Sequence, residues 1–299
     1  MAIAWLMLGA TQSFLGDRVT PTAAQEAFTR EVTAQAEYPW GGRTIFPDYR
    51  LVATYGSPVH PALGVLGERP VEKSIRYTKR LARQYTAHSK QPVLPAMEII
   101  ASVASASPTN DGDYSQEVPR KLLRQWVQAA GEQGVYVVLD LQPGRDSFLS
   151  QAKWLEDLLK EPHVGLALDP EWRLKRHQVH LEQIGSVQAR EVNKVAAWLA
   201  DLTAEHGLPQ KVFMVHQFRH DMIDKRQMLK TDHAELAYVI HMDGQGSQAS
   251  KKATYSQLLH KFPKHARTGW KNFFDEDKTL RSPAATLKLS PAPWFISYQ

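Results

Sequence analysis

The feature that most constrains the fold is a repeated alternation of short apolar segments with longer polar or amphipathic stretches. Apolar segments that lack a polar face are typical of parallel strands, which are covered on both sides. Eight such segments are predicted to be strands: Tyr49–Tyr55, Val93–Ala104, Val135–Leu141, Val164–Leu168, Lys211–His216, Leu236–His241, Thr268–Phe274 and Trp294–Tyr298.

The stretches between these strands carry apolar residues at helical spacing. The predicted helices are Pro70–His88, Val118–Gln133, Phe148–Leu159, Val187–His206 and Thr254–Phe262. Strands that alternate with helices indicate an α/β fold, and eight of them favour a single closed (β/α)8 barrel over an open doubly wound sheet. The passage Ser282–Pro293 is rich in proline, so the helix after the seventh strand is expected to be short or missing.

The first 40 residues are set apart from the predicted barrel, which we assign to residues 41–299. The segment MAIAWLMLGA is similar to the apolar part of an export signal, and it is too short to span a bilayer. Thr22–Glu37 is predicted to be a polar helix or linker that covers part of the barrel. We therefore expect a bacterial, extracytoplasmic protein that contacts the membrane only through an N-terminal signal or anchor.

Composition excludes several kinds of chemistry. The chain has no cysteine, which rules out disulfides, thiolate metal sites and a cysteine nucleophile. It also lacks a P-loop and a GxSxG nucleophile elbow, so we predict no cofactor. The formal net charge is +5, and the cationic stretches Lys79–Arg83 and Arg173–His177 accompany no nucleic-acid-binding motif. We predict no nucleic-acid partner.

The segment VGLALDPEW, at Val164–Trp172, ends an apolar strand in two carboxylates. Asp169 and Glu171 are two residues apart, so extended backbone would point both side chains to the same side. Pro170 between them favours an extended or turning chain. Trp172 offers a flat apolar surface beside the acids. We predict that Asp169 and Glu171 are the catalytic pair.

Polar residues also end or interrupt the other predicted strands. Parallel barrels carry their sites at the carboxyl ends of the strands, so these residues are expected to meet. Any one of them alone could be structural: Asp140 or Asp243 could cap a turn, and Lys271 could neutralise an acid. Gathered carboxylates, however, force one of their number to hold its proton. With Trp172, the candidate substrate-binding residues are Tyr55, Glu98, Asp140, Gln142, His216, Gln217, Asp243, Lys271 and Tyr298.

Two resemblances add to this interpretation. The motifs YGSPVHPALGVLGE, LDLQPGR, LALDPEWRL, QIGSV, HQFR and KNFFDED resemble a family of uncharacterised exported or lipid-anchored proteins of actinobacteria, over about Tyr49 to Gln299. Asp169-Pro170-Glu171 resembles the Asp-x-Glu end of the fourth strand in chitinase-type barrel glycosidases. That resemblance implies Glu171 as acid/base and Asp169 as the residue that orients a substrate acetamido group. The upstream acids of those enzymes are missing from Val164–Leu168.

Three functions remain open on the sequence. The leading one is a glycoside hydrolase that acts on a cell-wall or other extracytoplasmic polysaccharide, with no metal. The second is a metal-assisted hydrolase of phosphoesters or amides. The third is a non-catalytic barrel that binds glycan or another cell-envelope component. The second would place a divalent ion among Glu98, Asp140, Asp169, His216 and Asp243.

Overall fold

The computed structural model describes residues 35–299, which form one compact unit. The predicted export segment and nearly all of the predicted Thr22–Glu37 helix lie outside the described residues. Among the described residues, Gln35–Tyr38 is not helical. No helix among the described residues is long and apolar enough to cross a membrane.

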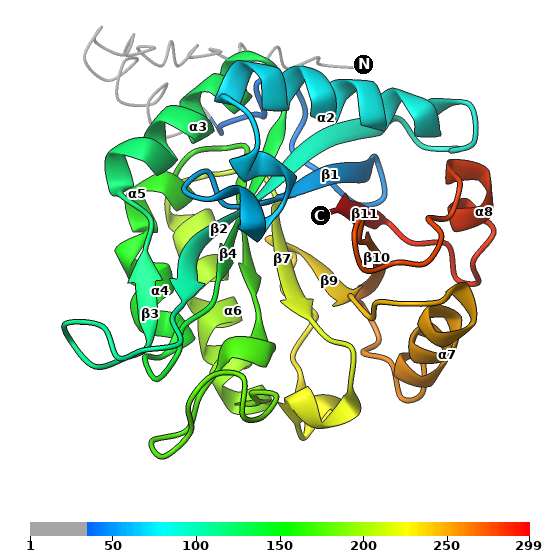
Figure 1. Ribbon diagram of the computed structural model, residues 1–299. Helices are drawn as coiled ribbons and strands as arrows, with labels where there is room; N and C mark the ends of the chain where they lie inside the picture. Colours follow the sequence, from blue (N-terminus) through cyan, green and yellow to red (C-terminus); the bar gives the residue numbers. More distant parts are fainter. Residues whose placement is uncertain (1–34) are drawn as a thin grey trace, which may run out of the picture. The chain divides into compact units, whose positions relative to one another are not determined.

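Eight parallel strands close into a barrel (Figure 1). Parallel pairing runs continuously from β1 through β2, β4, β5, β7, β9, β10 and β11. β11 returns to β1, with Thr54 opposite Tyr298. The prediction of a closed (β/α)8 barrel is therefore confirmed. The barrel strands are β1 (Arg50–Gly56), β2 (Val93–Ala104), β4 (Tyr136–Leu141), β5 (Val164–Leu168), β7 (Lys211–His216), β9 (Leu236–Met242), β10 (Arg267–Asn272) and β11 (Phe295–Tyr298).

Helices cover the outside of the barrel. α6 lies at the position predicted for it, whereas α7 begins six residues before the predicted Thr254, because Ser247 caps it by accepting a hydrogen bond from the Ser250 N–H. The predicted Phe148–Leu159 helix is split at Leu155. The helices are α2 (Val71–Thr86), α3 (Arg120–Glu132), α4 (Phe148–Trp154), α5 (Glu156–Leu159), α6 (Ala189–Glu205), α7 (Gln248–Leu258) and α8 (Pro283–Leu287).

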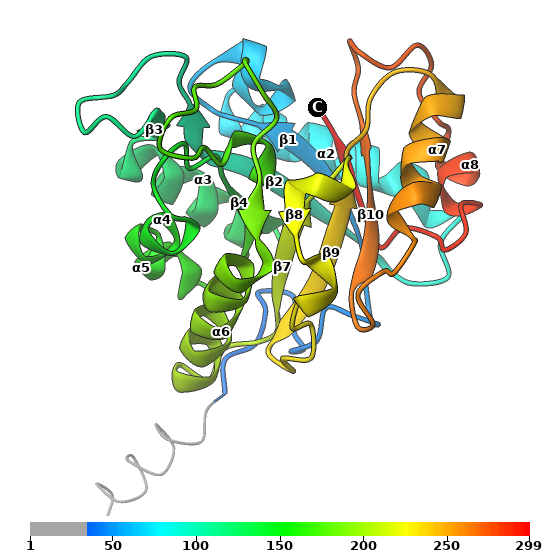
Figure 2. The ribbon, with the colours of Figure 1, turned by 90° about the horizontal axis from the view of Figure 1, so that it is seen from below.

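Two connections depart from the regular strand–helix alternation. The helix after β10 is the five-residue α8, as the proline-rich sequence predicts. No α-helix joins β7 to β9, where the chain forms only short 3-10 turns and a two-residue strand (Figure 2). The short elements are β3 (Ser115–Glu117), β6 (Val187–Gln188), β8 (Ile223–Asp224), η1 (Pro61–Leu63), η2 (Val65–Gly67), η3 (Pro170–Trp172), η4 (His220–Met222) and η5 (Arg226–Met228).

Large side chains fill the interior of the barrel below its mouth. Tyr136 lies at the centre and accepts a hydrogen bond from the Val212 N–H at 2.9 Å. A Cβ on Gly165 would meet the Val212 carbonyl oxygen at 2.5 Å, so β5 needs glycine there. Tyr38 and Phe46, from the segment before β1, join the same buried cluster. Packing against the barrel thus begins before residue 41, and this segment lies at the end of the barrel opposite the C-terminus (Figure 2).

Candidate active site

A pocket of about 340 Å³ opens where the carboxyl ends of the strands meet. The alternation of side chains along each strand aims one set inward, because neighbouring residues point to opposite faces. The strand-end loops add a rim of aromatic and polar groups. The predicted site residues that line this pocket are Tyr55, Gln142, Asp169, Glu171, Trp172, Asp243 and Lys271.

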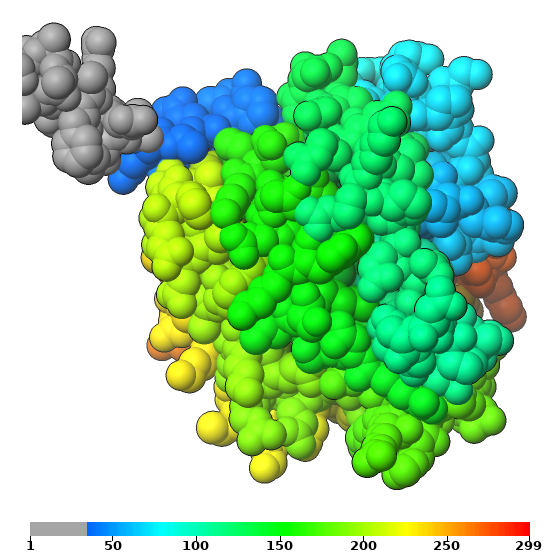
Figure 3. Space-filling model, turned by 90° about the vertical axis from the view of Figure 1, so that its left-hand side faces the viewer, coloured from blue at the N-terminus to red at the C-terminus, as the bar shows by residue number. Residues whose placement is uncertain are grey.

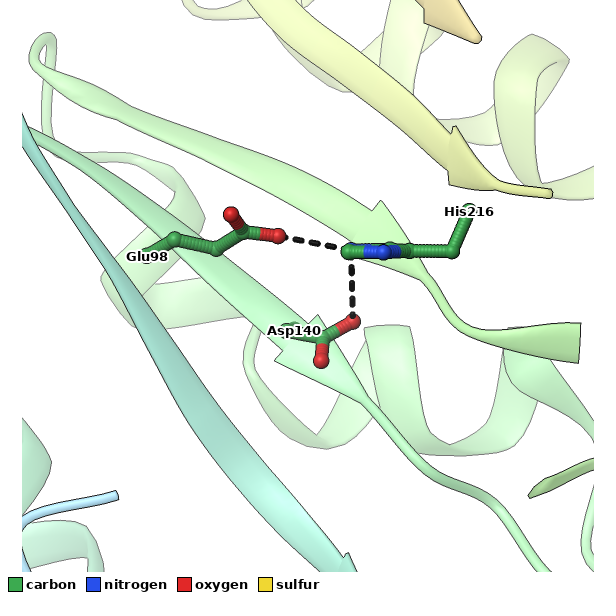
Figure 4. A group of neighbouring side chains, drawn as sticks. All are labelled: Glu98, Asp140 and His216. Atoms are coloured by element: carbon green, nitrogen blue, oxygen red, sulfur yellow. Dashed lines mark hydrogen bonds and ion pairs between the residues drawn. The ribbon is translucent and has the colours of Figure 1, made fainter. Parts of the chain in front are cut away.

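Three further predicted residues, Glu98, Asp140 and His216, do not line the pocket but are fully buried close by, inside the barrel (Figure 4). His216 Nε2 lies 2.6 Å from Glu98 Oε1 and 3.9 Å from Asp140 Oδ1. Its Nδ1 lies 2.8 Å from Asp243 Oδ2, and Asp243 does line the pocket. His216 therefore connects the buried acids to the pocket wall.

The electrostatics of this group favour a protonated histidine. Burial alone would lower the pKa of His216, but Glu98, Asp140 and Asp243 together raise that pKa well above its usual value. Both ring nitrogens then donate hydrogen bonds to carboxylates. Burial raises the pKa of Asp140 to about 6, although His216 opposes the rise. Tyr55 Oη donates to Asp140 Oδ2 at 2.9 Å and fixes that carboxyl group.

Asp169 and Glu171 both line the pocket, but the backbone between them differs from the prediction. Instead of continuing extended, the chain turns into η3 immediately after Asp169. Asp169 Oδ1 accepts a hydrogen bond from the Glu171 N–H at 3.2 Å and so caps this turn. The proline between the two acids suits the first position of such a turn. The carboxylates therefore share the pocket because of a capped turn, not because of strand periodicity.

Both carboxyl groups hold protons more tightly than usual. Burial, together with the charge of Asp243, raises the pKa of Glu171 to about 7, while Lys271 opposes the rise. Burial also raises the pKa of Asp169 well above its usual value, with contributions from Asp140 and Glu171. A half-buried Glu171 with this pKa is substantially protonated near neutral pH.

Lys271 is the cation of the pocket. Its ammonium nitrogen lies 3.4 Å from the centroid of the Tyr55 ring, which is a close cation–π contact. No salt bridge involves Lys271 in the described part of the chain. Its backbone carbonyl oxygen accepts a hydrogen bond from the Lys251 ammonium at 2.7 Å, and Lys251 also donates to Asp277 at 2.6 Å. This buried pair holds the end of β10 in place.

Two predicted site residues lie away from the pocket. Tyr298 points outward, where its hydroxyl lies 2.5 Å from the hydroxyl of Tyr85 on α2. Its neighbour Gln299 lines the pocket instead. Gln217 is fully buried, and its amide oxygen accepts a hydrogen bond from Arg226 at 2.9 Å. Alternation along β11 explains the first difference, and the turn after β7 explains the second.

Several pocket residues were not predicted from the sequence. Phe218 and Phe273 add apolar walls, and Glu276 adds another carboxylate. Phe273 follows Lys271 by two residues, so the spacing that places Lys271 inward could have found it. His241 is fully buried and packs edge-on against His216, with ring centroids 5.1 Å apart. A Cβ on Gly269 would lie 2.1 Å from His241 Nδ1, so this glycine makes room for the ring.

Among the described residues, Glu98, Asp140 and His216 offer ligand atoms within 4.8 Å of one another. Glu98 Oε2 and Asp140 Oδ1 are buried and have no hydrogen-bond partner. If His216 is neutral and its Nδ1–H donates to Asp243, its Nε2 faces the carboxylates of Glu98 and Asp140. A carboxylate that accepts a hydrogen bond from the other ring nitrogen is the usual support of a metal-bound histidine. The same Nε2 atom makes the ion pair with Glu98 when His216 is protonated. The trio can therefore serve as a metal centre or as a salt bridge.

No protein-family model matches the chain, and no curated protein matches it. Similar solved structures include glycoside hydrolases of the TIM-barrel type. An endo-β-N-acetylglucosaminidase from Cordyceps militaris has 13% sequence identity and a TM-score of 0.39, over 93% of this chain and 87% of that one. The GH5_18 protein from Streptomyces cattleya, in complex with Manβ1-4GlcNAc, has 13% identity and a TM-score of 0.41, over 83% and 70%.

A third similar structure is the 3-keto-D-glucoside 4-epimerase from E. coli. It has 12% identity and a TM-score of 0.36, over 83% of this chain and 90% of that one. The barrel assignment rests on the strand pairing of this chain, and the site rests on its own side chains.

Proposed function

We propose that this protein is a glycoside hydrolase in which Glu171 is the general acid. The observation that carries the proposal is the environment of Glu171: it lines a pocket with a second carboxylate, Asp169, and its pKa is raised to about 7. An acid of this kind can protonate a glycosidic oxygen as the bond breaks. Trp172 in the pocket wall offers a surface for a sugar ring.

Asp169 is proposed as the partner of Glu171. As a carboxylate it would stabilise the positive charge that develops on the sugar ring or orient a substrate acetamido group, as the Asp-x-Glu resemblance implies. Its turn-capping hydrogen bond holds the side chain beside Glu171. We expect Asp169→Asn to slow turnover, and to slow it more for N-acetylated sugars than for other sugars. Hydrolysis of matched chromogenic glycosides with and without the acetamido group measures this difference.

We propose a cell-wall or other extracytoplasmic polysaccharide as the substrate. The apolar segment MAIAWLMLGA and the resemblance to exported actinobacterial proteins support this location. Fractionation of the native host, with detection of the full chain in membrane, wall and medium, tests it. Recovery of the protein only from the cytoplasm would contradict the proposal.

The test of the catalytic assignment is Glu171→Gln, which keeps the shape of the side chain and removes its proton. We expect turnover of a cell-wall fragment or chromogenic glycoside to fall by roughly 10²-fold or more, with little change in melting temperature. Glu182→Gln is the matched control, because Glu182 is exposed on the same loop and does not line the pocket. If the parent cleaves a glycan and Glu171→Gln is equally active, the assignment fails.

A metal-assisted hydrolase is the second candidate, supported by the unpartnered oxygens of Glu98 and Asp140. Elemental analysis of the purified protein and activity after chelation separate the two candidates. Activity that is lost on chelation and restored by one divalent ion would favour the metal. Glycan binding without any turnover would favour the non-catalytic barrel.

A further inference from the structure

The outer face of the molecule carries a second feature, a chain of three hollows beside α6. Their volumes are about 450, 230 and 570 Å³. Gln188 and Glu191 line both the first and the second, while Gln188, Arg190 and Lys194 line both the second and the third, so neighbouring hollows adjoin one another across shared side chains. The first begins at Arg173, the residue after the pocket-lining Trp172.

The third hollow lies between α6 and the segment that takes the place of an α-helix between β7 and β9. The substituting segment is held against α6 at a distance that leaves a channel. β8 pairs with β6 just before α6, Lys230 N–H donates to Asn193 Oδ1 at 2.8 Å, and Asn193 Nδ2 donates to the Met228 carbonyl oxygen at 2.8 Å. Figure 2 shows β8 beside α6, and Figure 3 shows the neighbouring side of the molecule, where α3, α4 and α5 lie.

The charge of this groove is strongly positive. Eight lysines and arginines line the three hollows against two acids, Glu191 and Asp224, which is a net charge of +6. The whole chain has a net charge of only +5, so the rest of the molecule is slightly acidic. Six of the cations are exposed and form no ion pair within the described residues, and they define the basic groove: Lys175, Arg176, Arg190, Lys194, Lys225 and Lys230.

We propose that the basic groove binds a linear anionic polysaccharide, which carries a carboxylate or phosphate on its repeats and is the substrate of the proposed hydrolase. Unpaired cations along a channel attract a polyanion and release its counterions. No Phe, Tyr or Trp lines the three hollows, whereas sites for single-stranded nucleic acid use aromatic rings to stack bases. This difference disfavours single-stranded nucleic acid, and the hydrolase site proposed above is the reason to expect a glycan.

The acidic pocket and the basic groove then have separate tasks. In the pocket, Asp169, Glu171 and Asp243 disfavour an anionic group at the cleaved bond. The groove would hold charged sugar units of the same polysaccharide that lie several sugars from that bond. The proposal deepens the proposed function by naming its substrate class. Binding and turnover are measured separately, so that either can fail alone.

The test uses the full chain with Glu171→Gln, so that slow turnover does not consume the probe. Polygalacturonate and a phosphodiester-linked mannan present carboxylate and phosphate respectively, and methyl-esterified polygalacturonan is the neutral match. We expect at least one anionic glycan to bind and the neutral one to bind far more weakly. The triple substitution Lys194→Glu, Lys225→Glu, Lys230→Glu should weaken binding by roughly tenfold or more. It should also reduce the salt slope by about 0.7 per lost contact.

The matched control reverses three exposed cations on α2, by Lys73→Glu, Arg76→Glu and Arg83→Glu, with the same change in net charge. This control should bind the anionic glycan like the parent. The proposal would be overturned if both triple variants lost affinity for the anionic glycan equally, or if the neutral glycan bound as tightly as the anionic one. It would also be overturned if no anionic glycan bound, or if a thymidine oligonucleotide bound more tightly than the anionic glycan. Binding by an enzyme that hydrolyses nothing would leave the groove standing and remove the proposed function.

Discussion

At the scale of single residues, the candidate site is an electrostatic arrangement around His216. His216 lies between Glu98 and Asp243, and Asp243 lines the same pocket as Glu171. The negative charge of Asp243 and burial act in the same direction on Glu171, so that its proton is retained to higher pH. The sequence could place Tyr55, Asp243 and Lys271 in the pocket, because each lies at or next to the carboxyl end of an apolar strand.

Other residues of the site could not be assigned from the sequence, for physical reasons. Tyr298 and Gln299 are adjacent, and only the register of β11 against β1 and β10 decides which of them faces inward. The capped turn at Asp169 depends on a side-chain hydrogen bond that no periodicity reveals. The ring of His241 fits in its buried position because Gly269, on the neighbouring strand, has no side chain there.

The residue-scale prediction concerns pH. A general acid is active below its pKa, so the parent should lose kcat/KM as pH rises through about 7. Asp243→Asn keeps the side-chain shape and removes the charge that adds to the effect of burial on the pKa of Glu171. The basic limb of the profile should therefore move to lower pH, toward the ordinary range of a glutamate. Asp201→Asn, on the exposed side of α6, controls for net charge. An unmoved limb would show that Asp243 does not set the pKa.

At the scale of elements, β7 is more than a core strand. Its end provides His216, and its first residue, Lys211, is fully buried. The Lys211 ammonium donates to the carbonyl oxygens of Glu161 and Val164, both at 2.9 Å, and so ties β7 to the start of β5. Sequence spacing gave β5 and β7 with their observed bounds because both are short apolar segments between clear breaks. The lack of an α-helix between β7 and β9 was not predicted from the sequence.

The element-scale prediction follows from Lys211. Burial lowers its pKa from 10.5 to about 7 in the folded protein. Between these values the unfolded chain binds more protons, so this residue makes the free energy of unfolding rise with pH. From pH 7 to 9.5 the rise should be about 3 kcal/mol, and Lys211→Met should abolish it. Urea unfolding at both pH values gives the difference in the free energy of unfolding within each variant. A loss of stability that is equal at both pH values cancels in this difference.

Lys121→Met, at an exposed position of α3, is the control for this experiment and should keep the slope of the parent. The opposite sign of slope in the parent, or the same slope in Lys211→Met, would contradict the interpretation. Lys211 would then be charged in the folded state at pH 9.5.

At the scale of the whole molecule, the fold was largely predictable and the surface was not. Eight apolar segments with intervening helices leave few arrangements, because parallel strands need covering on both faces. The basic groove, in contrast, brings together Lys175, Arg190 and Lys225, which are far apart in sequence. Read singly, Arg173–His177 is an ordinary solvated stretch. Folding places this stretch beside α6, where Arg173, Lys175 and Arg176 line one hollow with Gln188 and Glu191.

The last prediction concerns closure of the barrel. β11 pairs with both β1 and β10, and its Phe295 and Ile296 are fully buried. Deleting residues 294–299 would expose two unpaired strand edges and open the core to water. We expect this truncation to be insoluble. Tyr298→Phe is the full-length control, since it removes only the hydroxyl contact with Tyr85, at a cost of about 1 kcal/mol. A truncated protein that stays soluble and melts cooperatively would mean that the barrel does not depend on its closing strand.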